Sequence, residues 1–262
     1  VVNTCGFIQP AKEEAIETIL ELVELKKEGT IKKIIVTGCL AERYKEEAAE
    51  QFPEADAVIG IGDTKDIVDG LNSVMQGERI VRFSPKLDAE LTGGRIISTL
   101  PFFSYLKVAE GCSNCCTYCA IPQIRGKFRS RPMEDLIAEA KELESLGVKE
   151  LTVIAQDITR YGQDLYGEYR LHELLHRISE ETTIPWLRIL YCYPDKITDE
   201  LIAEMRDNPR VVKYIDIPVQ HISDSVLRRM NRHGNQETVK DAIARIRAAI
   251  PDICLRSTVI VG

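Results

Sequence analysis

The sequence predicts an α/β protein in which an N-terminal domain with a parallel sheet is followed by a second series of βα units. Short apolar runs alternate with segments of helical period along most of the 262 residues, and this alternation is typical of parallel strands covered by helices. The alternation breaks once, over residues 78–102, where prolines and a glycine pair leave no clear period. We therefore expect an N-terminal domain over 1–77, a linker over 78–102 and a second domain over 103–262.

The N-terminal domain is predicted from strands and helices that follow one another in turn. A strand that ends at Cys5 opens it, and residues 11–29 form a helix that Gly29 stops. The expected buried face of this helix consists of Ala15, Ile16, Ile19, Leu20 and Val23. The elements expected next are strand 32–38, helix 40–52 before Pro53, strand 56–62, and helix 64–77 with Thr64 as its N-cap.

The second domain is predicted to contain five βα units. The expected strands are 103–111, 149–157, 185–194, 212–221 and 254–262, and the expected helices are 132–147, 169–182, 198–208, 223–232 and 236–250. Pro132 suits the first turn of its helix, and Thr198 or Asp199 suits the cap of another. Such a series either curls into a barrel or stays an open sheet, and in both cases the ligand site lies at the C-terminal ends of the strands.

Composition limits the classes of function. The net charge is -7, with 44% hydrophobic and 29% charged residues, which is typical of a globular protein and favours a basic partner over bulk nucleic acid. No apolar run reaches the ~18 residues of a membrane span. Without a signal peptide the expected compartment is the cytoplasm, where eight cysteines indicate metal or redox chemistry rather than disulfides. Both ends interrupt apolar runs, so we expect a fragment of a longer protein.

Four cysteines lie within the stretch "GCSNCCTYCA", at positions 112, 115, 116 and 119. Two adjoining CxxC pairs could bind zinc, but structural zinc sites separate their pairs by a dozen or more residues. The alternative omits Cys115 and uses the spacing C-x3-C-x2-C of Cys112, Cys116 and Cys119. Three thiolates can hold three irons of a [4Fe–4S] cluster and leave the fourth iron open, which is typical of a catalytic site.

This motif after the first strand of a βα series resembles the radical SAM superfamily, which has a partial or complete barrel. The longer stretch "GCSNCCTYCAIPQIRGKFRSRP" is similar to the methylthiotransferase family. The resemblance implies an incomplete radical SAM barrel over 103–262, a [4Fe–4S] cluster on the three cysteines, and S-adenosylmethionine (SAM) bound to its open iron. It also implies cleavage of SAM to a radical that abstracts hydrogen from an unactivated carbon.

The N-terminal stretches "VVNTCGF" and "VTGC" resemble the auxiliary-cluster domain of the same family. Cys5 and Cys39 match two of the three cysteines that hold a second [4Fe–4S] cluster there, and the third lies upstream in the family. The residues themselves agree, because Cys5 and Cys39 each end a predicted strand and neighbouring parallel strands bring such ends together. The alternative is that both are small buried hydrophobic residues.

Several polar residues near strand ends are candidates for binding SAM, with ordinary structural hydrogen bonds as the alternative for each. These candidates are Tyr118, Gln156, Asp157, Gln220 and Arg256. No catalytic residue is expected beyond the cluster ligands. Cys115 is expected to be a thiol outside the motif, and Cys192 and Cys254 are expected in the core. The basic stretch with Arg125, Lys127, Arg129 and Arg131 is either a solvated loop or an anion contact.

Two substrates are compatible with the family resemblance. The stretches "YCYPDKITDELI" and "YIDIPVQHIS" resemble the branch that modifies the β-carbon of an aspartate in uS12, protein twelve of the small ribosomal subunit. The other branch modifies an adenosine in tRNA. The family also implies an electron donor such as flavodoxin or ferredoxin, and we expect a monomer that does not bind membranes. A non-catalytic iron–sulfur or zinc module is the alternative from another class.

Overall fold

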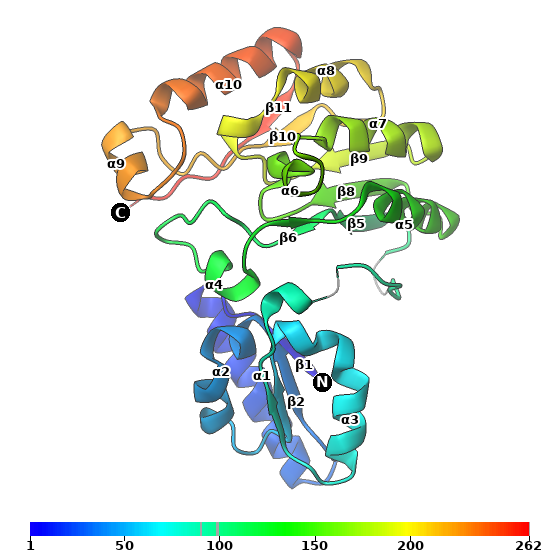
Figure 1. The fold of residues 1–262 in the computed structure, drawn as a ribbon, viewed down its shortest axis with the longest axis vertical. Coiled ribbons are helices and arrows are strands. Elements are labelled where there is room, and N and C mark those ends of the chain that lie inside the picture. Colours follow the sequence, from blue (N-terminus) through cyan, green and yellow to red (C-terminus); the bar gives the residue numbers. More distant parts are fainter. Residues whose placement is uncertain (90, 98–99, 262) are drawn as a thin grey trace. The chain divides into compact units, whose positions relative to one another are not determined.

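The structure, a computed structural model, describes residues 1–89, 91–97 and 100–261. Residues 90, 98 and 99 of the predicted linker and Gly262 of the last predicted strand lie outside this description. The chain divides into two compact units, Val1–Glu90 with Cys119–Gly126, and Leu91–Tyr118 with Lys127–Gly262 (Figure 1). The α/β class expected from the sequence is confirmed in both units.

The first unit is built on a parallel sheet with the strand order β1-β2-β3-β4. Its strands are β1 (Val2–Thr4), β2 (Ile35–Gly38), β3 (Ala57–Ile59) and β4 (Ile80–Arg82). Its helices are α1 (Gln9–Lys27), α2 (Cys39–Gln51), α3 (Ile67–Met75) and α4 (Ile121–Arg125), with 3-10 turns η1 (Ile61–Asp66) and η2 (Lys86–Asp88). Strand β1 pairs with β2 so that Thr4 lies opposite Gly38, and the two strands therefore end side by side.

Three details of this unit differ from the sequence expectations. Strand β4 lies within the segment for which a linker was expected, because Ile80 pairs with Ala57 and packs against the core, while Val81 and Arg82 are exposed. Thr64 belongs to η1 and does not cap α3. Of the predicted α1 face, Ala15, Ile19 and Val23 are buried, but Ile16 and Leu20 are exposed.

The second unit contains strands that follow one another in chain order. They are β5 (Phe103–Lys107), β8 (Glu150–Ile154), β9 (Trp186–Ile189), β10 (Tyr214–Asp216) and β11 (Cys254–Arg256), and a short antiparallel pair joins β6 (Ala109–Glu110) to β7 (Arg129–Ser130). The ladders β5-β8-β9 and β10-β11 are parallel. Leu187 of β9 donates its N–H to the Arg210 carbonyl and accepts a hydrogen bond from the Val212 N–H, just before β10. The order of the strands therefore does not reverse, as it would in a doubly wound sheet. This order is that of a barrel wall.

The helices of the second unit alternate with these strands. They are α5 (Met133–Ser145), α6 (Gln163–Tyr166), α7 (Leu171–Glu181), α8 (Asp199–Asp207), α9 (Asp224–Arg229) and α10 (Gln236–Ala249), and Figure 1 shows them in succession from green α5 to orange α10. Thr198 caps α8 by accepting from the Leu201 N–H at 3.2 Å. One apolar core joins strands and helices, with Leu106, Leu151 and Leu174 among its fully buried members. No helix in the described residues is both long and apolar enough to cross a membrane.

Two cysteines were expected in the core, and the structure confirms this for one of them. Cys192 is fully buried, and burial raises the pKa of its thiol. Cys254 is exposed, so its predicted core position is wrong. In β11 the side chains alternate, which leaves Leu255 half-buried while Cys254 and Arg256 face outward.

Candidate functional site: two cysteine-bearing loops

The cysteine motif lies in an irregular loop between β6 and α4. Cys112 is buried, Cys116 and Cys119 are half-buried, and Cys115 is exposed. Cys115 adopts a left-handed backbone conformation with φ of 52°, which non-glycine residues adopt infrequently. Its side chain is thereby presented to solvent, in keeping with a position outside the motif.

The loop is held by the segment that follows α9, more than one hundred residues away. The Asn231 amide donates to the Cys115 carbonyl at 2.9 Å. Thr117 donates from its N–H to the Met230 carbonyl at 3.0 Å and from its hydroxyl to the Arg229 carbonyl at 3.2 Å. Three hydrogen bonds therefore fix the backbone between Cys115 and Thr117, immediately around Cys116.

Arg232 brings a positive charge to this loop. Its guanidinium lies 3.9 Å from the Cys116 sulfur and donates to the Tyr118 hydroxyl at 3.0 Å and to the Pro218 carbonyl at 2.7 Å. It also lies 4.3 Å from the centre of the Tyr193 ring, within the range of a cation–π contact. Arg232 thereby links Cys116 to Tyr118, Pro218 and Tyr193.

Tyr118 is a predicted SAM contact that the structure places beside Cys116 and Arg232. Burial raises the pKa of Tyr118 to about 12, although the charge of Arg232 acts in the opposite direction. The phenol is therefore neutral at physiological pH. The residue as a whole is 43% exposed, so its side chain is accessible next to the motif.

A buried polar network supports the loop from the end of β8. The Asp157 carboxylate accepts hydrogen bonds from Asn114 at 2.8 Å, from the Thr159 hydroxyl at 2.6 Å and from Arg160 at 3.0 Å. Arg160 also donates to the side-chain amide oxygen of Asn114 at 3.0 Å. Burial raises the pKa of Asp157 despite these donors. Asp157 thus holds the motif through Asn114, a residue that sequence reasoning did not single out.

Gln156 lies next to this network and retains an unused acceptor. Its amide nitrogen donates to Glu110 at 3.1 Å. Its amide oxygen is buried and has no hydrogen-bond partner among the described residues. A buried polar atom without a hydrogen-bond partner destabilises the folded protein. This oxygen is therefore well placed to accept a hydrogen bond from a ligand.

The other two predicted SAM contacts lie elsewhere on the C-terminal strands. Gln220 has a left-handed backbone with φ of 65° and lines a pocket of about 470 Å³ together with His221, Met230 and Val259. The Arg256 side chain is 58% exposed and lies 3.7 Å from the Asp216 carboxylate. Hydrogen bonding to Tyr214 and the charge of Asp216 raise the pKa of Arg256. No contact in the described residues joins Gln220 or Arg256 to the cysteines.

In the first unit, Cys5 and Cys39 directly follow the paired ends of β1 and β2. The backbones at these ends are so close that Gly6 has no room for a side chain. A Cβ atom there would lie 2.8 Å from the Leu40 Cα and 2.9 Å from the Cys39 carbonyl carbon. The Thr4 hydroxyl accepts from the Leu40 N–H at 3.2 Å. The expectation that neighbouring strands bring these two positions together is confirmed.

Arginines also surround this second pair. Arg43 donates to the Gly6 carbonyl at 2.7 Å, and Arg125 of α4 donates to the Cys39 sulfur at 3.0 Å. Arg125 of the basic stretch is therefore engaged with the protein, whereas Lys127 is exposed. At its end, Arg131 is buried and pairs with Glu139 at 2.7 Å.

The cysteines of the two groups fit iron–sulfur clusters, since thiolates are the usual ligands of such clusters. In each group an arginine also lies beside a cysteine sulfur. Within residues 1–89, 91–97 and 100–261, no three His, Cys, Asp or Glu side chains are gathered as a ready metal site. Metal sites commonly assemble together with their metal. The assignment of Cys112, Cys116, Cys119, Cys5 and Cys39 as ligands therefore stays a prediction.

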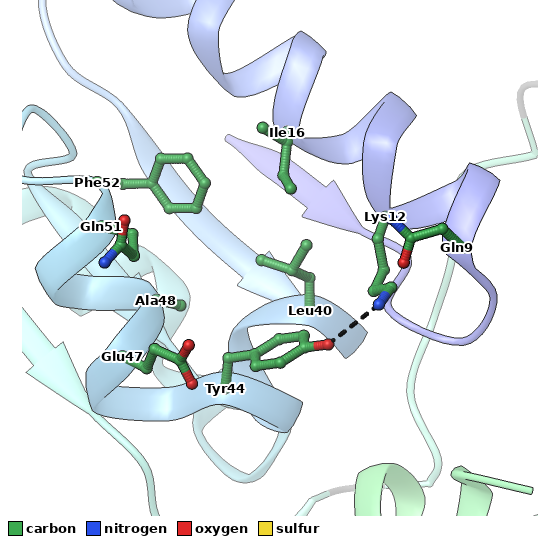
Figure 2. Close-up of a pocket in the computed structure, with 9 residues that line it drawn as sticks. All are labelled: Gln9, Lys12, Ile16, Leu40, Tyr44, Glu47, Ala48, Gln51 and Phe52. Atoms are coloured by element: carbon green, nitrogen blue, oxygen red, sulfur yellow. Dashed lines mark hydrogen bonds between the residues drawn. The ribbon is translucent and has the colours of Figure 1, made fainter.

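A separate pocket of about 280 Å³ lies between α1 and α2 (Figure 2). Ile16, Leu40 and Phe52 line its apolar side, and Lys12 donates to the Tyr44 hydroxyl at 3.2 Å. None of the residues predicted for a site from the sequence lines this pocket.

Comparisons with known proteins agree with this division of the chain. A family model described as the radical SAM superfamily matches residues 106–262, and one described as uncharacterized protein family UPF0004 matches residues 1–60. Proteins named ribosomal protein uS12 methylthiotransferase RimO are similar over the whole chain. The one from Clostridium tetani is 48% identical and the one from Geobacter sulfurreducens 46%. The chain spans 59% of the length of each of these two relatives.

Solved structures share the fold at low sequence identity. The radical SAM methyltransferase TsrM from Kitasatospora setae, solved with cobalamin and a [4Fe–4S] cluster, has a TM-score of 0.68 at 14% identity, covering 93% of this chain and 54% of that one. The cobalamin-dependent enzyme OxsB, solved with aqua-cobalamin and SAM, has a TM-score of 0.68 at 16% identity, covering 98% and 40%.

Proposed function

Because the chain belongs to the radical SAM superfamily, we propose that it is the catalytic part of a methylthiotransferase that modifies ribosomal protein uS12. The proposed reaction adds a methylthio group to the β-carbon of an aspartate. The observation that carries the proposal is the three-cysteine loop, which follows the first strands of the βα series and is fixed around Cys116 by Asn231 and Thr117. The similarity to proteins named uS12 methylthiotransferase along the whole chain supports it.

In this proposal Cys112, Cys116 and Cys119 hold a [4Fe–4S] cluster and leave one iron free for SAM. When bound, the cluster and SAM supply a one-electron cleavage that yields a carbon radical able to take hydrogen from an unactivated carbon. Arg232 places a positive charge beside the Cys116 sulfur, and Asp157 holds the loop through Asn114. The backbone on either side of Cys116 is held by the bonds of Cys115 and Thr117.

The predicted SAM contacts have distinct parts in the proposal. Gln156 offers its buried amide oxygen as an acceptor for an N–H or O–H group of SAM. Tyr118 offers a neutral ring face for the adenine. Asp157 shapes the site through its hydrogen bonds, while Gln220 and Arg256 lie near the ends of β10 and β11, where a ligand in a βα series binds.

Cys5 and Cys39 are proposed to hold the second cluster, with a third ligand upstream of Val1. We propose that the protein works as a monomer in the cytoplasm and receives electrons from a flavodoxin or ferredoxin. The acidic net charge of -7 suits a basic ribosomal protein substrate.

The experiment that tests the substrate compares uS12 and tRNA from a strain that lacks the gene. Mass spectrometry is expected to show uS12 without its methylthio group and tRNA with unchanged modification. Loss of a methylthio group from tRNA alone would overturn the proposal in favour of the tRNA branch. Normal modification of both molecules would favour the non-catalytic module.

A further inference from the structure

We propose that Arg125 is a positioning residue of the second iron–sulfur site, where its guanidinium donates to the Cys39 sulfur and raises the reduction potential of the cluster. This inference rests on the proposed function, because it takes Cys39 as a cluster ligand. The central observation is the distance of 3.0 Å between the Arg125 Nη2 atom and the Cys39 Sγ atom.

Arg125 is presented by a helix that is anchored in the same compact unit as Cys39. It is the last residue of α4, and its neighbour Ile124 is fully buried in a small apolar cluster with Ile61 and Ala89. Cys39 packs against the same cluster. The apolar contact of Ile124 therefore brings the guanidinium to the sulfur.

A second set of contacts fixes the backbone of α4. The Lys86 ammonium bonds to the Gln123 carbonyl and lies 3.8 Å from the Glu42 carboxylate. Glu42 is fully buried, and its other oxygen accepts from the Ile61 N–H at 2.9 Å. Because Glu42 lies one turn after Cys39 in α2, the helix that carries the cysteine is also linked to α4.

The sign of the effect follows from charge. Reduction adds one electron to a cluster and its thiolates, so a cation that donates to a ligand sulfur stabilises the reduced form more than the oxidised form. The Arg125 guanidinium keeps its charge at all physiological pH values. The cluster at Cys39 is thus easier to reduce with Arg125 than without it.

Arg125 is also close in sequence to the three-cysteine motif. The compact unit that contains Cys39 also contains residues 119–126, which begin with the last cysteine of the three-cysteine motif. Arg125 lies six positions after Cys119, so one short segment carries a ligand of the first cluster and the hydrogen-bond donor to a ligand of the second.

The test is a redox titration of the reconstituted full-length protein, followed by EPR. A background in which Cys112, Cys116 and Cys119 are all alanine removes the first cluster, so that the signal belongs to the second. Arg125→Gln is expected to shift the midpoint potential downward, and Arg125→Lys to recover most of the shift because it retains the charge. The matched control is Arg82→Gln, which removes the same charge from an exposed side chain on β4 of the same unit.

The outcomes separate this inference from the proposed function. Cys39→Ala is expected to abolish the second cluster, and a cluster that survives this change would overturn both the assignment of Cys39 as a ligand and the role of Arg125, without touching the proposed reaction. A lost cluster in Cys39→Ala with an unchanged potential in Arg125→Gln would overturn the role of Arg125 alone. Equal shifts in Arg125→Gln and Arg82→Gln would show a general charge effect and overturn it too.

Discussion

Arg232 and Cys116 lie 116 positions apart in the sequence, yet the guanidinium of one lies 3.9 Å from the sulfur of the other. The same guanidinium packs on the Tyr193 ring and donates to Tyr118 and Pro218. The side chain thereby joins the cysteine loop to the ends of β9 and β10. It supplies both a positive charge and a structural link at the proposed cluster site.

Replacing Arg232 by methionine is expected to lower the free energy of unfolding by about 1–3 kcal/mol, the usual range for one cation–π contact with its hydrogen bonds. It should also expose the loop around Cys116 to proteases. Urea denaturation and limited proteolysis measure the two effects. The matched control is Arg228→Met, since Arg228 bonds to the Asp224 carbonyl of its own helix at 3.3 Å. Equal losses in both variants would contradict the role of Arg232.

Removal of single cysteines distinguishes the motif from its neighbour. Cys116→Ala is expected to lose about four irons from the reconstituted protein, because a cluster needs its thiolates. Cys115→Ala should retain them, since the exposed Cys115 side chain lies outside the motif spacing. Iron and sulfide analysis after anaerobic reconstitution measures both. Loss of iron in Cys115→Ala with full iron in Cys116→Ala would reverse the assignment.

Asp157→Asn is expected to destabilise the protein by about 3–5 kcal/mol, because removing one partner of a buried ion pair leaves the other uncompensated. Arg160 forms an ion pair with this carboxylate, and the Asn114 amide donates a hydrogen bond to it. Chemical denaturation measures the loss. Asp199→Asn is the control, since the side chain of Asp199 is 81% exposed in its pair with Arg245 and such pairs contribute about 0–1 kcal/mol. A similar change in both variants would argue against a structural role for Asp157.

The stability of the first unit should depend on pH through Asp56. Burial acts to raise the pKa of Asp56, but hydrogen bonds from Lys26, the Ile34 N–H and Lys33 outweigh it and lower the pKa. The folded state therefore binds this proton less readily than the unfolded state. The stabilisation is complete above the unfolded pKa of about 3.9 and is lost as the pH falls through the lower folded value.

Denaturation curves between neutral pH and about pH 2 test this prediction. Asp56→Asn is expected to be less stable than the parent at neutral pH, and the difference should shrink in acid. A difference that stays constant over the whole range would contradict the role of the Asp56 carboxylate.

Local patterns in the sequence were sufficient to predict the alternation of strands and helices, because helical period and short apolar runs are properties of neighbouring residues. They also placed the three-cysteine motif after the first strand of the second series, and Cys5 and Cys39 at neighbouring strand ends. Strand β4 was missed because a strand of three residues that ends in an arginine is too short to stand out from a linker. Cys254 was misplaced because an apolar run does not indicate which face of a strand is covered.

The residues that support the site could not be predicted in this way. Arg232, Asn114 and Arg125 act through contacts with residues 116, 43 and 86 positions away. Although Asn114 lies in the cysteine stretch and Arg125 in the basic stretch after it, the local sequence does not show which distant side chain each of them contacts. Only the fold shows that Arg125 and Arg232 lie against cysteine sulfurs.

The most direct test of the account is EPR of the reduced, reconstituted protein with and without SAM. The account predicts a [4Fe–4S] signal that changes when SAM is added, together with formation of 5′-deoxyadenosine. Both effects should persist in Cys115→Ala and disappear in Cys116→Ala. A signal that SAM leaves unaltered, or a colourless protein that binds only zinc, would contradict the account.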